Sequence, residues 1–502
     1  MFWLGIATVS IGQPILSAQN MSLGGAGVAY SEGIASIHLN PANLQMHDTS
    51  KTIAIRIGTG GAQFDPIESR AKPRDQWNNF KQYLQVHDPT PATIGFTDLS
   101  RLQYLQNQYP GNATRAHYSA RVEIQPVAVS YHTNRYSLGI SFRTRIANRM
   151  VVGKGWFSPE TVDSEEKGAL LDRTLDQQYQ SFHEISFSYA QPLTYLNGLT
   201  SNLGKFYVGI SPKFLFGGTF MDVQYQNNYL TQPEGNKNIR SLAFRGSGTY
   251  SLLTDDLRRG ISASQAIKEN LDAESLLEST GYGIGIDFGL TYTYPLGGEI
   301  QLQDGEVLFR QKNQKALRLS LSASDIGFFN HQDSPRVFKT LKDTNKTGPP
   351  GQLTLSSEKF TGAPGQFYHW IEKYSMMDQP FQSSVLETNS FMQMLPASLQ
   401  GGIALLYDRL TVTADLQTTL VQSVFYGSGL SFHSGIEYYL VKQWPIRAGL
   451  QIRKNNNSRL SFGTGFEARH WAITTGIQIS GETNRVNTDL YGAAFAAITM
   501  NL

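Results

Sequence analysis

The residues that could carry catalysis or bind a metal are scattered along this chain. Its ten histidines form no His-Glu-x-x-His pattern and no other close metal-ligand spacing. No Gly-x-Ser-x-Gly nucleophile motif lies at a strand-to-helix turn. The absence of cysteine excludes thiolate metal sites, disulfides and cysteine nucleophiles together. We therefore expect no enzyme, no catalytic residue, no metal and no cofactor.

Two other patterns suggest ligand binding. The glycine repeat in 281–285 (GYGIG) matches part of a dinucleotide fingerprint, but it lies within an alternating strand, where a small inner face explains it better. Four basic residues lie on the polar faces of expected strands, where they could meet an anionic ligand, be solvated or pair with carboxylates. They are Arg143, Arg145, Lys205 and Lys213.

The stretch Gly281–Tyr294 (GYGIGIDFGLTYTY) indicates which elements hold these residues. Apolar and aromatic side chains alternate with small or polar ones along its whole length, which predicts a β-strand. Such a strand reaches about 45 Å at roughly 3.3 Å per residue, whereas an ordinary strand has about 5–6 residues. Its apolar face has tyrosine at both ends and aliphatic residues between them, which is typical of a lipid-facing barrel strand.

Composition agrees with a transmembrane β-barrel and not with spanning helices. The chain has 502 residues, 40% of them hydrophobic, and a mean hydropathy of −0.29. After the amino-terminal segment no apolar run reaches the roughly 18 residues of a spanning helix. A soluble β-sandwich array or propeller would share this composition, so the strand pattern decides. A net charge of +2 without a basic tract predicts no nucleic-acid partner.

Similar alternation recurs along the chain and indicates about 14 or 15 strands, of which a single-chain bacterial barrel takes an even number. Pro212 cannot donate to a strand ladder, so we expect a bulge or kink there. The expected strands, besides 281–294, are 52–58, 122–131, 136–146, 181–191, 203–216, 317–323, 395–403, 410–417, 432–440, 445–450, 460–468, 471–479 and 495–502.

The amino terminus divides into two segments. Residues 1–19 are similar to a secretory signal peptide, with an apolar core before Ser17-Ala18-Gln19, and we expect its removal near Ala18 or Gln19. A buried amino-terminal segment is the alternative. The following residues 20–50 contain Ser-Leu-Gly-Gly-Ala-Gly at 22–27 and Asn-Pro-Ala at 40–42. These glycines permit tight packing, and Asn-Pro is a turn or helix-start signal.

The Gly-Gly-Ala-Gly and Asn-Pro-Ala motifs together resemble the mature amino terminus of FadL/TodX-type outer-membrane transporters. They also resemble PorV-like and uncharacterised Bacteroidetes outer-membrane barrels, as do residues 324–329, 395–396 and 445–449. The resemblance implies an all-β, antiparallel barrel of 14 strands with residues 20–50 folded inside the lumen as a hatch. It also implies a sideways exit for substrate. The hatch residues it indicates are Gly24, Gly25, Gly27, Asn40 and Pro41.

The barrel itself is expected over residues 51–502, with long, partly helical loops between its strands. These loops are expected at 59–120, 147–180, 217–238, 251–280 and 327–393.

Two functions are consistent with this interpretation, both in the bacterial outer membrane with its lipid as a partner. The first is passive transport of a small hydrophobic compound, fatty-acid or hydrocarbon-like, which the hatch-like motif favours. The second is a non-transporting scaffold whose loops bind a secreted or cell-surface protein, as the resemblance to secretion-associated PorV-like barrels implies; the length of the loops favours this one. We favour transport, because the resemblance supplies a mechanism for it.

Overall fold

The computed structural model describes residues 17–46, 53–67, 115–153, 175–193, 204–232, 235–247, 280–296, 315–332, 336–339, 353–355, 384–387, 390–421, 423–425, 429–453, 458–468, 471–481 and 490–501. Residues 1–16, on which most of the expected signal peptide falls, lie outside this part, as do most residues of the expected helical loops.

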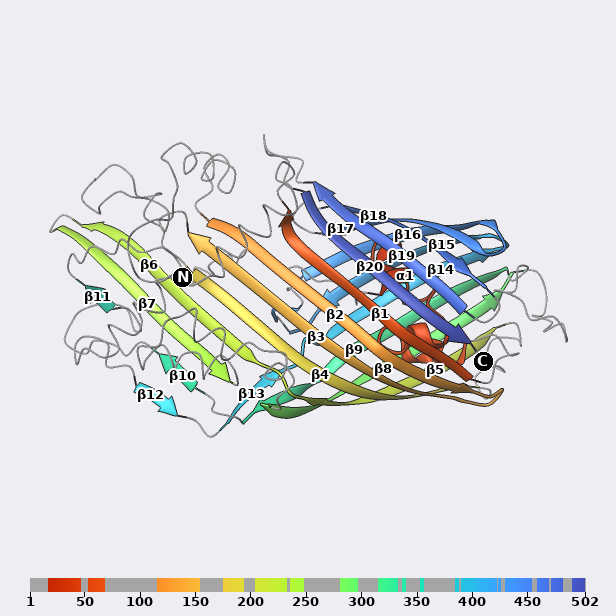
Figure 1. Cartoon of the computed structure of the whole chain (residues 1–502), viewed down its shortest axis with the longest axis horizontal. Helices are drawn as coiled ribbons and strands as arrows, with labels where there is room; N and C mark the ends of the chain where they lie inside the picture. The colour runs from red at the N-terminus through yellow and green to blue at the C-terminus, as the bar shows by residue number, and fades with distance from the viewer. Residues whose placement is uncertain are drawn as a thin grey trace.

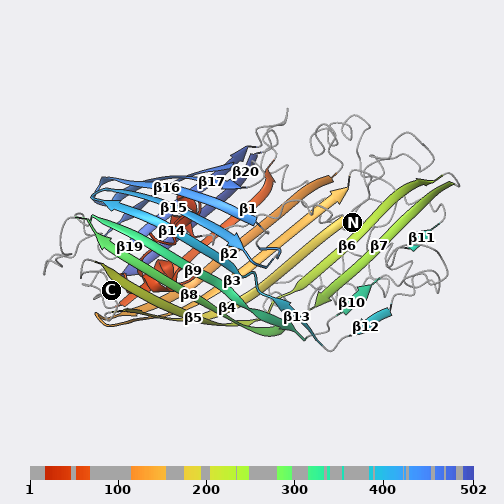
Figure 2. The ribbon, with the colours of Figure 1, turned by 180° about the vertical axis from the view of Figure 1, so that it is seen from behind.

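Fourteen strands, each antiparallel to its neighbours, form a closed barrel in which β20 pairs with β1 (Figure 1, Figure 2). The expected all-β, antiparallel barrel of about 14 strands is confirmed. In order around the barrel the strands are β1 (Ile53–Ile67), β2 (Arg115–His132), β3 (Ser137–Gly153), β4 (Leu175–Pro192), β5 (Lys205–Phe216), β8 (Gly281–Pro295), β9 (Ala316–His331), β14 (Ser398–Tyr407), β15 (Leu410–Thr419), β16 (Gly429–Val441), β17 (Trp444–Arg453), β18 (Ser458–Glu467), β19 (Trp471–Gly481) and β20 (Leu490–Asn501).

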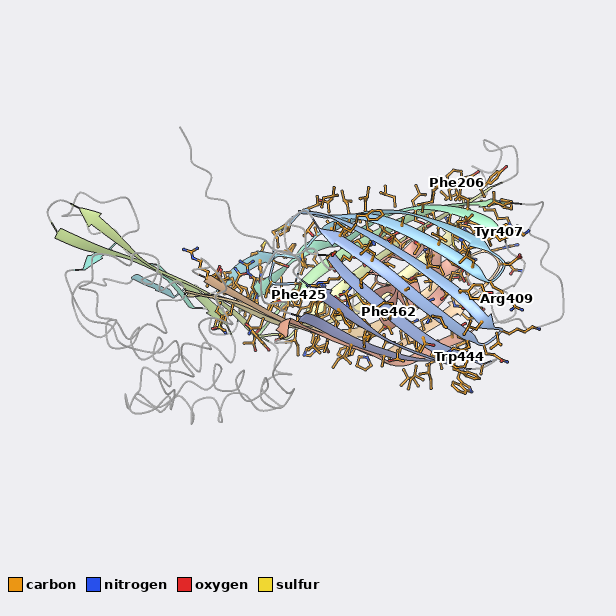
Figure 3. All side chains as sticks on the ribbon, turned by 90° about the horizontal axis from the view of Figure 1, so that it is seen from above. Phe206, Tyr407, Arg409, Phe425, Trp444 and Phe462 are labelled. Carbon is orange, nitrogen blue, oxygen red and sulfur yellow. The ribbon has the colours of Figure 1, made fainter. Side chains whose placement is uncertain are left out.

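The outer surface of the barrel is an apolar belt. On β8, Tyr282 and Ile284 are 53% and 57% exposed, whereas the glycines and threonines between the apolar positions face inward. Aromatic side chains gather at one end, where Figure 3 labels Phe206, Tyr407 and Trp444. A barrel that spans a bilayer presents an apolar band with aromatic residues at its edges to the lipid. Closure of the sheet also leaves no strand edge with unpaired backbone groups in the lipid. The protein is therefore a bacterial outer-membrane barrel.

The two ends of the barrel differ. Residues 133–136, 408–409 and 442–443 form tight turns at the end that we call the short-turn end. The opposite, long-loop end carries the longer connections between strands. Short turns face the periplasm in bacterial barrels, so the long-loop end faces outward. Within the described residues, no helix is long and apolar enough to cross a membrane.

Six further strands lie beyond the long-loop half of the barrel: β6 (Phe220–Gln232), β7 (Gly235–Ser247), β10 (Arg336–Lys339), β11 (Leu353–Leu355), β12 (Ser384–Glu387) and β13 (Phe391–Met394). β6 pairs with β4, and β7 joins β6 to β10 and β11, so a small sheet extends away from the barrel (Figure 1). Much of this sheet falls in the ranges 217–238 and 327–393, which were expected to be loops. Strands that project beyond the bilayer need no lipid-facing side, so they lack the apolar alternation that marks a strand in sequence.

Residues 17–46, which we call the plug, lie inside the barrel (the red segment in Figure 1). The plug contains α1 (Ala18–Ser22), η1 (Gly33–Ser36) and η2 (Pro41–Gln45). The Ser17 side chain caps α1, and the Asn40 side chain caps η2, whose first residue is a proline. Such short helices have little stability alone, so contacts with the wall hold the plug.

Candidate functional site

The five residues that the sequence indicated as hatch residues all lie in the plug. Gly24, Gly25 and Gly27 have positive φ angles of 72°, 86° and 147°, which L-residues with a Cβ rarely adopt. Asn40 Oδ1 accepts a hydrogen bond from a backbone N–H of η2 at 3.2 Å, and Pro41 begins η2. Glycine and the Asn-Pro pair are therefore used here for backbone geometry.

Glycines in the barrel wall let the plug approach closely. A Cβ built on Gly435 of β16 would lie 2.5 Å from Leu23 Cβ, and one on Gly449 of β17 would overlap the backbone of Leu23 and Gly24. A larger residue at these positions would push the plug away from the wall. Other wall glycines that face the plug in this way are Gly139, Gly209, Gly289, Gly402, Gly463 and Gly476.

Buried polar groups of the wall also hold the plug. Asp415 Oδ2 of β15 accepts hydrogen bonds from the N–H groups of Gly27 at 2.6 Å and Val28 at 2.9 Å. His433 Nδ1 of β16 lies 2.8 Å from the carbonyl oxygen of Gly24. Because buried backbone groups need partners, these bonds fix the segment of the plug that follows α1 to one side of the barrel.

A cluster of paired charges fills the lumen on the long-loop side of the plug. Its members project inward from six consecutive barrel strands, where alternation places polar residues on the inner face. Four are cations and four are carboxylates, so their formal charges cancel. The charged cluster consists of Arg121, Glu123, Arg143, Arg145, Glu184, Lys213, Asp287 and Asp325, all at most 5% exposed.

Short ion pairs connect the members of the charged cluster. Arg143 Nε lies 2.6 Å from Glu184 Oε1, and Arg145 Nη1 lies 2.9 Å from Asp325 Oδ2. Lys213 Nζ lies 2.7 Å from Asp325 Oδ1 and 2.8 Å from an oxygen of Asp287. Pairing of this kind compensates buried charges for the hydration that they lose.

A β-bulge places Asp325 in the cluster. Earlier in β9 the even-numbered residues Ser320 and Ser322 face inward, whereas Asp325 and Phe329 do so after the bulge. The register between β8 and β9 shifts at this point, and Asp325 has a φ of 57° and donates its N–H to Asp287 Oδ1 at 2.7 Å. Bulges re-aim side chains in this way near functional parts of barrels.

The structure brings together three of the four basic residues singled out in the sequence. Arg143, Arg145 and Lys213 lie in the charged cluster, paired with carboxylates. Lys205 is exposed at the first residue of β5 and takes no part, because this strand end lies at the mouth of the barrel. The four carboxylates were not among the site residues predicted from the sequence. Their inward alternation, as for Asp287 in 281–294, was the available signal.

The plug reaches the charged cluster through His38. Its Nε2 lies 2.7 Å from Ser141 Oγ, and its Nδ1 lies 3.2 Å from Glu184 Oε1. Burial, together with the positive charges of Arg143 and Lys213, holds the pKa of His38 well below its usual range. His38 is therefore neutral at physiological pH and leaves the charge balance of the cluster unchanged.

An apolar layer covers the charged cluster on the long-loop side. The guanidinium of Arg145 lies 5.1 Å from the ring centre of Phe182 and 4.7 Å from that of Phe425. Cation–π contacts of this kind join the two layers. The apolar layer consists of Ala147, Phe182, Leu215, Phe329, Leu395 and Phe425, all at most 2% exposed.

The barrel wall is split beside the apolar layer. β4 pairs with β5 up to Phe216 and then with β6 from Phe220 onward. Between these strands, residues 217–219 cross the wall, and Thr280 Oγ1 donates to the carbonyl oxygen of Gly218. Among the described pairings none joins the β6–β7 hairpin to β8, so a seam lies between the hairpin and β8. A bulge or kink was expected at Pro212 of β5. There the ladder between β4 and β5 is interrupted, but its register does not change.

Aromatic side chains fill the inner side of the seam. The ring centre of Phe220 lies 5.0 Å from that of His331 and 5.4 Å from that of Phe391. His331 stacks on Phe391 at 4.6 Å, and its other side contacts Phe329 of the apolar layer at 4.7 Å. The seam aromatics, Phe220, His331 and Phe391, are therefore continuous with the apolar layer.

Fold and lumen define the class of protein: a plugged, fourteen-stranded outer-membrane barrel with a charged and an apolar layer above the plug. Residues 78–475 match the model of a family of unknown function, DUF5723, and the chain belongs to that family. No curated protein matches the chain. Within the described residues no group of acidic and histidine side chains is arranged to hold a metal ion.

Several solved barrels are similar in overall fold. The Pseudomonas putida toluene transporter TodX is 10% identical, with a TM-score of 0.43, covering 98% of this chain and 99% of its own. A TodX deletion mutant, described as a monoaromatic hydrocarbon channel, is 11% identical with a TM-score of 0.45 and covers 97% and 98%. A Pseudomonas aeruginosa FadL homologue is 9% identical with a TM-score of 0.44 and covers 98% and 99%.

These comparisons confirm the expected resemblance to FadL/TodX-type barrels as one of fold. At such low identity the likeness does not extend to individual ligand-binding residues. The resemblance to PorV-like barrels stays a prediction.

Proposed function

We propose that this barrel admits a small hydrophobic compound, hydrocarbon-like or fatty-acid-like, from its long-loop end and releases it sideways into the outer membrane. The supporting observation is the order of layers in the lumen. The apolar layer lies toward the outside, and the charged cluster and the plug lie beneath it. An apolar molecule moving straight on would have to displace paired charges, which is costly, because each separated charge stays buried without its partner.

The seam supplies the alternative route. It lies at the level of the apolar layer and above the charged cluster: along β5, Leu215 of the apolar layer follows Lys213 of the cluster, and the strand ends at Phe216. The seam aromatics offer an apolar surface, and among the described pairings no ladder hydrogen bond joins the β6–β7 hairpin to β8 or β9, so these rings can separate without breaking one. The release step in this proposal is a displacement of these rings.

Cross-linking the seam tests the proposal. The chain has no cysteine, so the pair Phe220→Cys and Phe391→Cys can be joined selectively by a short, reducible thiol cross-linker. We expect cross-linking to abolish uptake of a radiolabelled alkylbenzene and of radiolabelled decanoate by cells that carry the protein, and a reductant to restore it. The control pair, Leu405→Cys with Val412→Cys, joins two neighbours that already pair in the ladder between β14 and β15. Uptake that persists through the closed seam contradicts the sideways route.

The small sheet beyond the barrel favours a second candidate, the protein scaffold. β6 and β7 project from the wall, and β10, β11 and β12 continue their sheet (Figure 1, Figure 2). A projecting sheet offers strand edges to a partner chain. Mass spectrometry of the protein purified from native outer membranes separates the two functions. A stoichiometric hydrophobic compound supports transport, and a stoichiometric protein without one supports the scaffold.

A further inference from the structure

A cavity of about 230 Å³ lies between the plug and the wall strands β1 and β20, on the short-turn side of the charged cluster. Its walls include Ile34 and Met46 of the plug and Ala54, Arg56 and Ala497 of the barrel. A second cavity of about 30 Å³ shares part of this lining, including Arg56 and Thr59, and is also lined by His38 and Arg143. By volume the larger cavity holds a small organic molecule, while the smaller one holds about two waters.

Arg56 is the unusual group in this cavity. Its side chain is 8% exposed, and its Nε donates to Thr499 Oγ1 at 3.2 Å. Within the described part of the chain, Arg56 makes no ion pair. Nearby, the buried Oγ1 of Thr59 has no hydrogen-bond partner and lines the same cavity. A buried guanidinium with two free nitrogens and a free hydroxyl beside it form an incomplete polar site.

The carboxylates around the cavity do not neutralise Arg56. Glu32 pairs with Arg318 at 2.6 Å. Glu467 pairs with Arg447 at 3.0 Å and accepts a hydrogen bond from Tyr439 at 2.9 Å. Arg447 also pairs with Glu437 at 2.6 Å, so Glu437 and Glu467 share one cation. Both acids of the lining are therefore held by other arginines, and Arg56 is left without a carboxylate at ion-pair distance among the described residues.

We propose that this cavity binds a small organic carboxylate, with its anion on Arg56 and a compact apolar group against the alanines and Ile34. One guanidinium matches one carboxylate in charge and in its forked geometry. The Thr59 hydroxyl supplies a further donor. A doubly charged phosphate would require a second free cation, which the lining described above does not supply. Because its walls are largely apolar, the cavity suits a carboxylate with an apolar group better than a fully hydrated anion such as chloride or acetate.

The site lies apart from the apolar layer and the seam, so it goes beyond the transport route proposed above. Its residues come from both the plug and the wall. A bound carboxylate would therefore bridge the two and hold the plug in place. The lining residues lie near the short turns, so the ligand enters from the periplasmic side.

Binding measurements on the full-length protein in detergent test this site, with benzoate and hexanoate as probes. We expect saturable benzoate binding by calorimetry, and a loss of at least tenfold in affinity in Arg56→Gln. Arg56→Lys keeps the positive charge but lacks the forked guanidinium, so its benzoate affinity should lie between those of the wild-type protein and Arg56→Gln. The matched control is Arg409→Gln, which removes an exposed arginine at the short-turn end (labelled in Figure 3) and should leave binding unchanged.

Three further results would overturn the proposal: benzyl alcohol binding as tightly as benzoate, inorganic phosphate displacing benzoate, or no benzoate binding to the wild-type protein. Benzoate binding that survives in Arg56→Gln would overturn it as well. Heat-dependent migration in gels establishes that each variant is a folded barrel, so lost binding is not lost folding. Cross-linking of the seam should leave benzoate affinity unchanged, which separates this site from the sideways route.

Discussion

Two buried arginines in different regions of the same lumen have opposite surroundings. Arg145, in the charged cluster, is completely buried and lies 2.9 Å from Asp325. Arg56, toward the short-turn end, is buried almost as deeply and has a threonine hydroxyl as its partner. Residue type and burial are alike, so the difference lies in the carboxylates of the neighbouring strands. A paired arginine stabilises the barrel, whereas an unpaired one is available to a ligand.

The largest expected effect follows from removing a paired charge. Arg145→Met should lower the free energy of unfolding by about 3–5 kcal/mol, because Asp325 and its neighbouring carboxylates keep their charge without this partner. Urea-induced unfolding followed by tryptophan fluorescence measures the change. As a control, Asp408→Asn in the exposed turn after β14 should change the free energy by less than about 0.5 kcal/mol. Equal effects of the two substitutions would contradict the role given to the cluster.

A smaller effect is expected from pushing the plug off the wall. Gly449→Ala places a methyl group against the backbone of Leu23 and Gly24 and should destabilise the plugged barrel by about 1–3 kcal/mol. Conductance in planar bilayers should rise as the plug moves, and benzoate binding at Arg56 should weaken. Gly401→Ala is the matched control, since its new Cβ would meet nothing closer than 3.7 Å. An unchanged conductance in Gly449→Ala would show that the glycine contact does not hold the plug.

The carboxylate that binds the plug backbone should matter less. Asp415→Asn keeps one oxygen for the N–H groups of Gly27 and Val28 but removes the charge, so we expect a loss of about 1 kcal/mol. Faster hydrogen exchange at these two amides is the direct readout. Exchange rates equal to those of the wild-type protein would contradict the anchoring role.

The smallest effect is expected at the unpaired arginine. Arg56→Met should leave the free energy of unfolding within about 0.5 kcal/mol of wild type in the absence of a carboxylate, because no ion pair is lost. Adding benzoate should stabilise the wild-type protein and not the variant. A loss comparable to that of Arg145→Met would remove the contrast between the two regions.

The sequence by itself determined the barrel. Alternation over 281–294 placed its tyrosines and isoleucines outside and its glycines and Asp287 inside, because a strand between lipid and lumen has two different faces. It also placed Arg143, Arg145 and Lys213 on inner faces. The strands within 220–247 were not predicted from the sequence, because a sheet beyond the bilayer has no lipid-facing alternation of apolar residues.

Only the tertiary structure decided what the inner charges do. The pairing of Arg145 with Asp325 depends on residues 180 positions apart and on a bulge that turns Asp325 inward. Arg56 is one of many basic residues in the sequence, and its isolation depends on which carboxylates the closed sheet leaves beside it. Alternation fixes the face of a residue, but the shear and closure of the barrel fix its neighbours, and the neighbours decide whether a buried charge is paired.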